Sequence, residues 1–385
     1  MKVIHTSDWH LGRSLHGYSL IEDQKYILDK LLAYTKEEEI DLLIIAGDVY
    51  DKSQPSDEAI RLFNYFLNEM IMKQQIPTVV IAGNHDSGTK IHFGSSLFEG
   101  QDLHIVGQCD TGYKRITIDK EEESIDIYMI PYMTPGIVRD IAQDETIKSH
   151  EESMAYLVEE IKKEKRSGAS IAVAHAFVAG GDPSDSEKNL CAVGTAELVG
   201  AYHFKDFTYT ALGHLHKPQK ISEEYIRYSG SLLKYSTSEA GHQKGVTLLE
   251  IKGNELVKIQ NIALQTKRDL RILTGSLEDI IVKATVETES EKDDYIFAKI
   301  IGQPIPDIMS ILKKIYPRTL GVEFISEREA KKSIEQEMEE LAYQRSKSAT
   351  ELFMEFLDYV GDVEFEETEK HYIEEVIRAL EEGEL

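Results

Sequence analysis

The sequence predicts an α/β protein with a layered α-β-β-α core, followed by a small α+β domain and a helical C-terminal tail. Apolar strands alternate with amphipathic helices in the first part of the chain, the pattern changes near Thr266, and residues 327–385 are acidic and helical in character. Strands that are apolar throughout need cover on both faces, and this favours stacked sheets with helices outside them.

The first domain is expected to span residues 1–265. Apolar residues at helical spacing predict helices at 19–39 and 57–73. A Lys252-Gly253-Asn254 turn predicts a hairpin of strands 245–251 and 256–264. Short apolar runs predict buried strands at 3–6, 42–46, 78–82, 125–130, 170–175 and 208–212.

Two smaller segments follow. Residues 266–326 are expected to form a domain of β-α-β-α-β order, with strands at 270–273, 295–301 and 320–324 and helices at 277–282 and 306–315. Residues 327–385 carry two apolar stripes at helical spacing, separated by Gly361-Asp362. The tail is too small for a core of its own, so it packs on its own enzyme or docks on a partner.

Composition limits the class of protein. No apolar run reaches the roughly 18 to 20 residues that span a bilayer, and the N-terminus does not resemble a secretory signal. Cys109 and Cys191 form no disulfide framework, so a reducing cytoplasm is expected. The net charge of −26 argues against a simple basic DNA binder, but bound divalent cations reverse the local sign at a metal site.

Five short motifs end or follow predicted strands, and they carry carboxylate, amide and imidazole groups. Ligands collect at the carboxyl ends of strands in α/β sheets, so these motifs are expected to converge. Mixed oxygen and nitrogen ligation suits Mn²⁺, Zn²⁺ or Fe²⁺ better than Mg²⁺ or Ca²⁺. The motifs are Asp8-Trp9-His10, Gly47-Asp48, Gly83-Asn84-His85-Asp86, His175 and Gly213-His214-Leu215-His216.

Taken singly, most of these motifs have an ordinary structural interpretation. Gly47-Asp48 is typical of a turn, and His175 alone is typical of a buried core histidine. The string Gly83-Asn84-His85-Asp86 is more specific, because four residues in a fixed order seldom arise by chance. The five motifs in this order, each at a strand end, together predict a metal site.

The longer strings HTSDWHLGR, IAGDVYD, VIAGNHDS and TALGHLHKPQ, followed by Tyr228-Ser229-Gly230-Ser231, resemble the calcineurin-like metallophosphoesterase superfamily. Within it, they are similar to the SbcD family, the nuclease subunits of bacterial SbcCD complexes. The resemblance covers the first domain closely. It extends more loosely to residues 266–326, which match the family's capping domain in place and size.

The resemblance implies two divalent metal ions, most often Mn²⁺, with Mg²⁺, Zn²⁺ or Fe²⁺ as alternatives. It assigns one metal to Asp8, His10, Asp48 and His216, and the other to Asn84, His175 and His214 with Asp48 as the bridge. His85 matches the family's catalytic histidine. Asp86 is left with two interpretations, orienting that imidazole or capping the following turn.

One position departs from the wider family. Archaeal and eukaryotic relatives have a second active-site histidine where this chain has Asp51, so no such role is carried over, and the bacterial group is favoured. Basic residues near the ligand motifs are candidates for phosphate contacts, although their number is close to that expected by chance. They are Arg13, Lys52, Lys90 and Lys217.

The leading hypothesis for function is a metal-dependent DNA exo- and endonuclease. The resemblance implies docking of the tail helices on the coiled coil of the ATPase SbcC, in a heterotetramer that contains an SbcD homodimer. A phosphatase or phosphodiesterase acting on a small molecule or a phosphoprotein is the alternative, because one metal site hydrolyses many phosphoesters. A degenerate scaffold without activity is disfavoured because every ligand position is intact.

Overall fold

The structure is a computed structural model of the full chain, and it describes residues 1–187 and 197–329. Apart from residues 327–329, the expected acidic tail and its docking helices lie outside the described residues, as does Cys191. Within the described residues, no helix combines the length and apolar character that crossing a membrane requires.

One half of the core is a six-stranded sheet in which four neighbouring strands run parallel and a hairpin forms one edge. The parallel strands are joined by crossover segments, as parallel pairing requires. In spatial order the strands are β16 (Glu255–Ala263), β15 (Gly245–Lys252), β1 (Lys2–Thr6), β4 (Leu42–Ile45), β5 (Thr78–Ile81) and β6 (Leu103–Val106).

The other half is a second six-stranded sheet with four parallel central strands and one antiparallel strand at each edge. In spatial order the strands are β13 (Gln219–Ile221), β14 (Glu223–Tyr228), β12 (Tyr209–Gly213), β9 (Ala169–His175), β8 (Glu123–Ile130) and β7 (Lys114–Lys120).

The two sheets pack face to face, and alternation along the strands explains why they are apolar throughout. In β4, Leu42 and Ile44 join the apolar cluster between the sheets, whereas Leu43 and Ile45 join the cluster on the helical side. Side chains of period two therefore fill two separate cores from one strand. This confirms the predicted burial of both faces.

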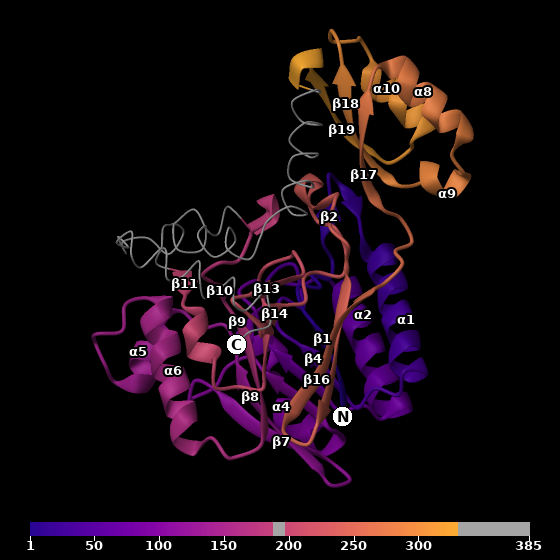
Figure 1. Cartoon of the computed structure of the whole chain (residues 1–385). Helices are drawn as coiled ribbons and strands as arrows, with labels where there is room; N and C mark the ends of the chain where they lie inside the picture. The colour runs from indigo at the N-terminus through magenta and orange to yellow at the C-terminus, as the bar shows by residue number, and fades with distance from the viewer. Residues whose placement is uncertain (188–196, 330–385) are drawn as a thin grey trace, which may run out of the picture. The chain divides into compact units, whose positions relative to one another are not determined.

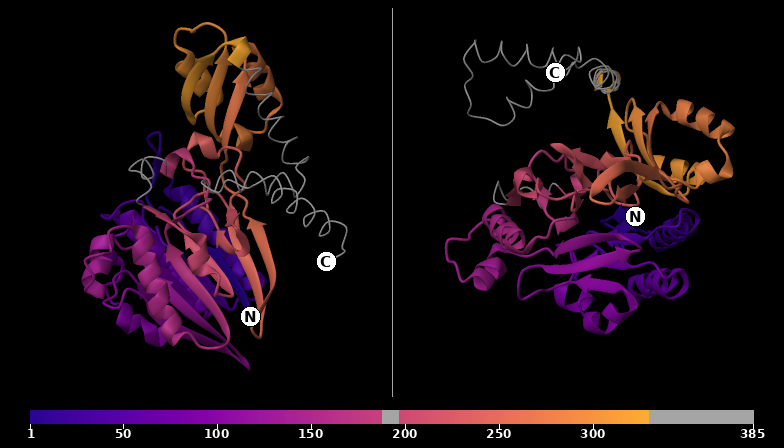
Figure 2. Two further views of the ribbon diagram at one scale, coloured as in Figure 1. Left: turned by 60° about the vertical axis from the view of Figure 1, so that its left-hand side comes forward. Right: turned by 60° about the horizontal axis from the view of Figure 1, so that its bottom comes forward.

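Helices form the two outer layers. The first sheet is covered by α1 (Ile21–Glu37) and α2 (Asp57–Leu67), and the second by α5 (Pro135–Ala142) and α6 (His150–Glu164) (Figure 1). The right-hand view of Figure 2 shows the same order of layers. The predicted α-β-β-α core is therefore confirmed. The helix expected at 57–73 differs in one respect, because its second part is a wider π-helical turn at Asn68–Gln74.

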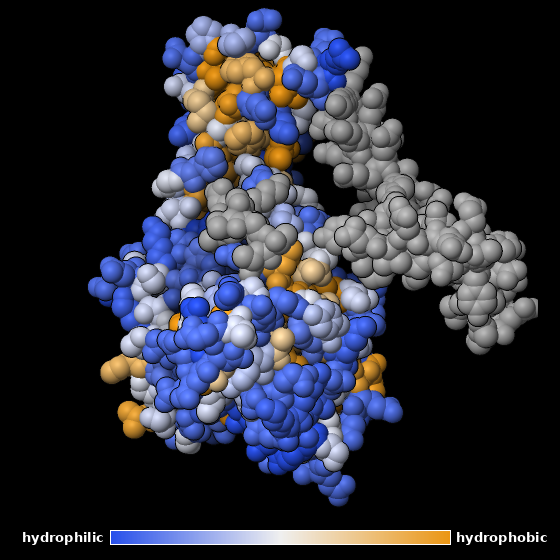
Figure 3. Space-filling model, turned by 90° about the vertical axis from the view of Figure 1, so that its left-hand side faces the viewer, coloured by the Kyte–Doolittle hydropathy of each residue, from blue (hydrophilic) through white to orange (hydrophobic). Residues whose placement is uncertain are grey.

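The surface over α5 and α6 is largely hydrophilic, as expected for helices that bury one face only (Figure 3).

Short elements complete the core. The short elements are β2 (Ser14–Leu15), β3 (Tyr18–Ser19), α3 (Gly88–Ile91), α4 (Ser95–Phe98), β10 (Phe177–Val178) and β11 (Leu198–Val199).

The expected β-α-β-α-β order after the core is confirmed, with one additional short helix. A three-stranded sheet has the order β17 (Leu270–Gly275), β18 (Tyr295–Ile301) and β19 (Thr319–Ile325). Its helices are α8 (Leu277–Val286), α9 (Glu289–Lys292) and α10 (Ile308–Ile315). The larger of the two compact units of the chain contains all of Met1–Leu273. The domain limits at 265 and 326 stay predictions.

Candidate metal centre

The predicted ligand residues come from the carboxyl ends of five strands, three in one sheet and two in the other. Asp8 and His10 follow β1, Asp48 follows β4 and Asn84 follows β5. His175 is the last residue of β9, and His214 and His216 follow β12. Because the two sheets are stacked, their strand ends form one site. Neither sheet supplies all seven residues.

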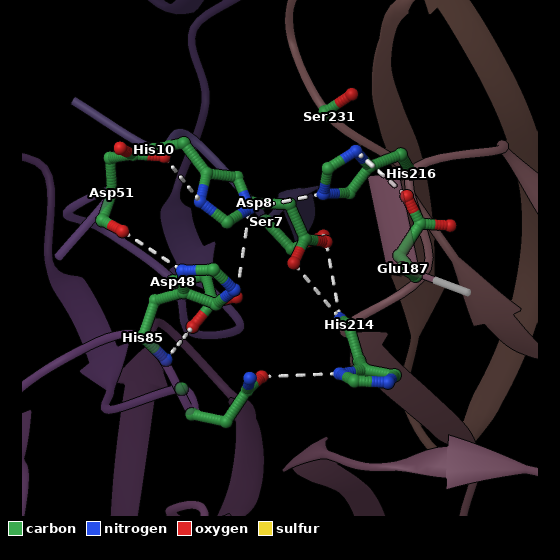
Figure 4. A network of polar contacts seen from close by, with 12 residues as sticks. Ser7, Asp8, His10, Asp48, Asp51, His85, Glu187, His214, His216 and Ser231 are labelled. Carbon is green, nitrogen blue, oxygen red and sulfur yellow. Dashed lines mark hydrogen bonds and ion pairs between the residues drawn. The ribbon is translucent and has the colours of Figure 1, made fainter. Parts of the chain in front are cut away.

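One set of ligand atoms converges around His10 and His216. Their Nε2 atoms lie 3.0 Å apart, and Figure 4 shows the two imidazoles pointing toward each other. His10 Nε2 lies 3.6 Å from Asp48 Oδ2. Asp8 shares this position, because its ligand atom lies within 4.8 Å of those of His10 and His216. We call Asp8, His10, Asp48 and His216 the first ligand group.

A second set converges around Asn84. Its Oδ1 lies 2.9 Å from His175 Nε2 and 3.1 Å from His214 Nδ1. His175 Nε2 is also 3.5 Å from Asp48 Oδ2. The same Asp48 oxygen therefore lies near both sets. We call Asn84, His175 and His214 the second ligand group.

The backbone at the site adopts conformations that residues other than glycine seldom take. Four predicted ligand residues have positive φ: Asp8 (54°), His10 (44°), Asp48 (51°) and His214 (112°). Such non-glycine positions carry strain and cluster at functional sites. These loops therefore adopt a less favourable backbone conformation, and this conformation directs the four side chains toward the site.

Two glycines of the motifs leave room for the ligands. A Cβ on Gly83 would lie 2.2 Å from Asp48 Oδ1, and a Cβ on Gly47 would lie 2.4 Å from His175 Nδ1. Gly47 also has a φ of +93°, which favours glycine. These two positions explain why glycine precedes Asp48 and Asn84.

The charges of the buried groups are poorly balanced by protein alone. Burial raises the pKa of Asp8 to about 6, against the lowering influence of His175. Burial also lowers the pKa of His10 well below its ordinary value, with His216 acting in the same direction, and it lowers that of His214 to about 3. His10 is therefore neutral and forms no true ion pair with Asp48. Neutral imidazoles beside buried carboxylates are the state that a divalent cation requires.

The ring nitrogens of the second ligand group also fit a cation. His214 directs Nδ1 at Asn84 Oδ1, 3.1 Å away, so Nδ1 is the atom that joins this group. His175 Nδ1 donates to Ala46 O at 2.9 Å, which leaves its Nε2 lone pair facing the site. The donor set and its geometry thus fit divalent metal ions.

His85 lies beside both groups without joining either. Its backbone N–H donates to Asp48 Oδ1 at 2.8 Å. Its Nδ1 lies 2.9 Å from Asp51 O, and a carbonyl only accepts, so Nδ1 carries a proton and Nε2 is the free ring nitrogen. The ring meets His10 edge to face, with centroids 4.7 Å apart.

The partners of Asp86 differ from both interpretations, which were orientation of the His85 imidazole and capping of the following turn. Its carboxylate accepts hydrogen bonds from the backbone N–H groups of Val49 at 3.1 Å, Tyr50 at 2.9 Å and Gly83 at 2.9 Å. No contact with the His85 ring is present among the described interactions. Asp86 therefore ties the loop after β4 to the loop after β5.

Asp51 and the basic residues also have definite partners. Arg13 Nη1 lies 3.1 Å from Asp51 Oδ1, and that oxygen is 3.8 Å from His10 Nδ1. Lys90 donates to Ser53 O at 2.9 Å, and Lys217 pairs with Asp182 at 2.5 Å. Lys52 is exposed. Three of the four basic candidates are thus engaged within the protein.

Several residues that support the ligands were missed by the sequence analysis. Ser7 donates to Asp8 Oδ2 at 2.5 Å and contacts Ser229 Oγ at 3.0 Å. Behind His216 lie Glu187, Glu239 and Lys244, all buried. Burial opposes a charge on His216, but hydrogen bonds with Glu187 and Glu239 raise its pKa to about 9. No sequence pattern marks Glu187, Glu239 and Lys244, because their contacts with His216 join distant segments.

Comparison with known families identifies the class of protein. Residues 1–218, more than half of the 385-residue chain, match the calcineurin-like phosphoesterase family, and the chain belongs to this family. It is thus a metal-dependent phosphodiesterase. Residues 266–360 match SbcD_C, described as the type 5 capsule protein repressor C-terminal domain. This second match confirms the resemblance to SbcD-type nuclease subunits.

Solved structures of similar proteins are distant. The phosphoesterase YfcE from E. coli is 12% identical, covering 69% of this chain and 100% of that chain with a TM-score of 0.29. GAP50, the anchor in the inner membrane complex of Plasmodium, is 11% identical, with 85% and 98% covered and a TM-score of 0.40. A dimetal phosphatase from Danio rerio is 9% identical, with 69% and 99% covered and a TM-score of 0.39.

Proposed function

We propose that this protein is a Mn²⁺-dependent DNA nuclease with exo- and endonuclease activity, the nuclease subunit of an SbcCD-type complex. The observation that carries the proposal is the SbcD_C match that follows the phosphoesterase match on the same chain. The ligand geometry by itself supports phosphoester hydrolysis and does not select DNA.

In this proposal the first ligand group holds one cation and the second group holds the other, with Asp48 between them. The support is the position of Asp48 Oδ2, which lies 3.6 Å from His10 Nε2 and 3.5 Å from His175 Nε2. Two divalent cations supply positive charge that stabilises the phosphoryl oxygens and activates water for attack. Mn²⁺ is preferred because the donor set mixes imidazole with oxygen.

The role of His85 follows from its hydrogen bonds. Its Nδ1–H is held by Asp51 O, so Nε2 is the atom that can give a proton to the departing oxygen or stabilise its charge. The backbone N–H of His85 is fixed on Asp48, and this couples the position of the ring to the ligand loops.

The proposed partners are DNA and a coiled-coil ATPase of the SbcC type. The tail from residue 327 would dock on that coiled coil, within a heterotetramer that contains a homodimer of this chain. The support is the extension of the SbcD_C match to residue 360, beyond the three-stranded sheet. A DNA substrate in a bacterial cell keeps the cytoplasm as the expected location.

The test compares substrates of two classes with the full chain. We expect cleavage of linear duplex and hairpin DNA that requires Mn²⁺, stops with EDTA and increases with the SbcC-type ATPase and ATP. p-Nitrophenyl phosphate serves as the monoester control. Rapid hydrolysis of the monoester without cleavage of either DNA, with the ATPase present, would reject the nuclease and favour the small-molecule or phosphoprotein phosphatase.

A further inference from the structure

The turn at Tyr228-Ser229-Gly230-Ser231 lies against the backbone of a predicted ligand. Ser231 N donates to His216 O at 3.2 Å. Gly230 has a φ of +73°, and a Cβ there would lie 2.6 Å from His216 O. The turn therefore lies so close to His216 that only glycine fits at position 230. No step of the proposed hydrolysis uses this turn.

The same carbonyl is held by a buried lysine. Lys244 Nζ donates to His216 O at 2.7 Å, to Ser231 Oγ at 2.9 Å and to Glu239 Oε2 at 2.6 Å. The side chains of Lys244 and Glu239 are 2% and 0% exposed. An ammonium group has three protons, and all three are used here. A buried charge with this many partners is fixed in one orientation.

The other oxygen of Glu239 is directed at the ring of His216. The distance from Glu239 Oε1 to His216 Nδ1 is 3.3 Å, and Glu187 Oε1 lies 3.0 Å from the same nitrogen. Ser186 Oγ joins the two carboxylates and lies 3.0 Å from Nδ1. With carboxylates around Nδ1, that nitrogen carries a proton, so Nε2, which faces His10 and the site, is the nitrogen that a cation would use (Figure 4).

We propose that Glu239 and Lys244 form a buried positioning pair that holds His216 at both its ring and its backbone carbonyl. The pair fixes the direction of the imidazole and keeps Nδ1 protonated, so that Nε2 is the nitrogen offered to a cation, and Ser231 orients the lysine. This inference rests on the proposed assignment of His216 to the first cation. It makes Glu239 and Lys244 positioning residues, because neither reaches the reacting atoms.

A different interpretation of the same cluster is a third metal site. Glu187, His216 and Glu239 place ligand atoms within 4.8 Å of one another, which a cation could use. Lys244 already supplies a positive charge 2.6 Å from Glu239. The carboxylates thus have a counter-ion from the protein, and we assign the cluster to support of His216.

The test measures Mn²⁺ binding to the full chain by calorimetry and needs no catalytic activity. We expect Glu239→Gln to weaken one of two Mn²⁺ equivalents about 10- to 100-fold, the usual cost of losing such a supporting group. The other equivalent keeps its affinity. Lys220→Met is the matched control, since it removes an exposed ion pair with Glu224 and should leave both affinities unchanged.

A second arm asks whether the effect passes through His216. In a His216→Ala background, Glu239→Gln should change the remaining affinities less than about threefold, because coupled residues are not additive. An undiminished effect in that background would show that Glu239 acts elsewhere and would overturn the proposal. So would wild-type affinity in Glu239→Gln alone, or a third Mn²⁺ equivalent that this substitution removes.

Loss of folding is separated from loss of positioning by a double variant. Lys244→Met alone leaves Glu239 buried without a counter-ion, whereas Glu239→Gln with Lys244→Met removes both charges. The double variant should unfold at a temperature nearer that of the wild type than Lys244→Met does, yet bind Mn²⁺ as weakly as Glu239→Gln. Restored affinity would overturn the proposal. Absence of DNA cleavage would reject only the proposed function.

Discussion

The two ligand groups meet at one aspartate but differ in what surrounds them. In the first group, Asp8, His10 and His216 are at most 3% exposed. Behind His216 stands the charged network of Glu239 and Lys244. This group is held by hydrogen bonds in the interior of the protein.

The second group has fewer charged supports and lies nearer the surface. Asn84 is only half-buried, and a small cavity beside Asn84 and His214 is lined by Tyr132, His150 and Phe177. His175 is held by a backbone carbonyl, at 2.9 Å from Ala46 O. Substrates enter through concave, accessible surfaces. The comparison therefore suggests that the first group is fixed and that the second faces the substrate.

The strongest challenge to this division is to remove the residue that the groups share. We expect Asp48→Ala to lose both Mn²⁺ equivalents and to lower hydrolysis of bis(p-nitrophenyl) phosphate at least about 10³-fold, the scale of losing one preorganised electrostatic group. Equilibrium dialysis with metal analysis counts the equivalents. Asp182→Ala is the control, because its side chain is 65% exposed. A variant that keeps one equivalent at full affinity would place Asp48 in one group only.

A smaller effect is expected at the histidine that belongs to neither group. His85→Ala should lower phosphodiester hydrolysis about 10²- to 10⁴-fold, the usual contribution of a positioned acid or base. Both Mn²⁺ equivalents should remain, since His85 contacts Asp48 only through its backbone N–H.

The control for His85 is a histidine in an exposed turn. His16 has a φ of +47°, and His16→Asn suits this conformation and should retain wild-type turnover. If His85→Ala loses a Mn²⁺ equivalent, His85 is a ligand, and the division into two groups needs revision.

The strands and the convergence of the predicted ligand residues could be expected from the sequence because each leaves a local pattern. Leu42–Ile45 is buried on both faces and is therefore apolar throughout, and Asp48 follows it at the strand end. The glycines before Asp48 and Asn84 belong to the same short motifs. Local order was enough to place these residues at one edge.

The supporting residues could not be predicted, because their contacts join segments that have no pattern in common. Glu239 lies 23 residues after His216 and ends a short 3-10 helix, and Lys244 lies 28 residues after His216 and directly precedes β15. Neither position belongs to a repeating pattern. Asp86 illustrates the same limit, since its partners are backbone N–H groups. The wider turn at Asn68–Gln74 has the same apolar spacing as a regular helix, so periodicity predicted the helix and not its change of pitch.

The smallest expected effect concerns the stability of the metal-free protein against pH. His216 has a pKa raised from 6.5 to about 9, whereas that of His214 is lowered to about 3. A raised folded-state pKa gives stability that is present below pH 6.5 and is lost as the pH rises through about 9. His214 is neutral in both states above pH 6.5 and contributes nothing in this window. Burial raises the pKa of Asp86 to about 7, so this carboxyl titrates only at the lower end of the window.

We therefore expect metal-free protein to lose about 2 to 3 kcal/mol of unfolding free energy between pH 6.5 and 9, from a shift of about two units at a buried group. Chemical denaturation in EDTA at several pH values measures it. Glu239→Gln should reduce the slope, because that carboxylate helps to keep His216 charged. Saturating Mn²⁺ should also remove the slope, since a bound cation requires neutral imidazole. A slope that is equally steep in Glu239→Gln would mean that another group titrates, and the contrast between the two ligand groups would then not arise from the network behind His216.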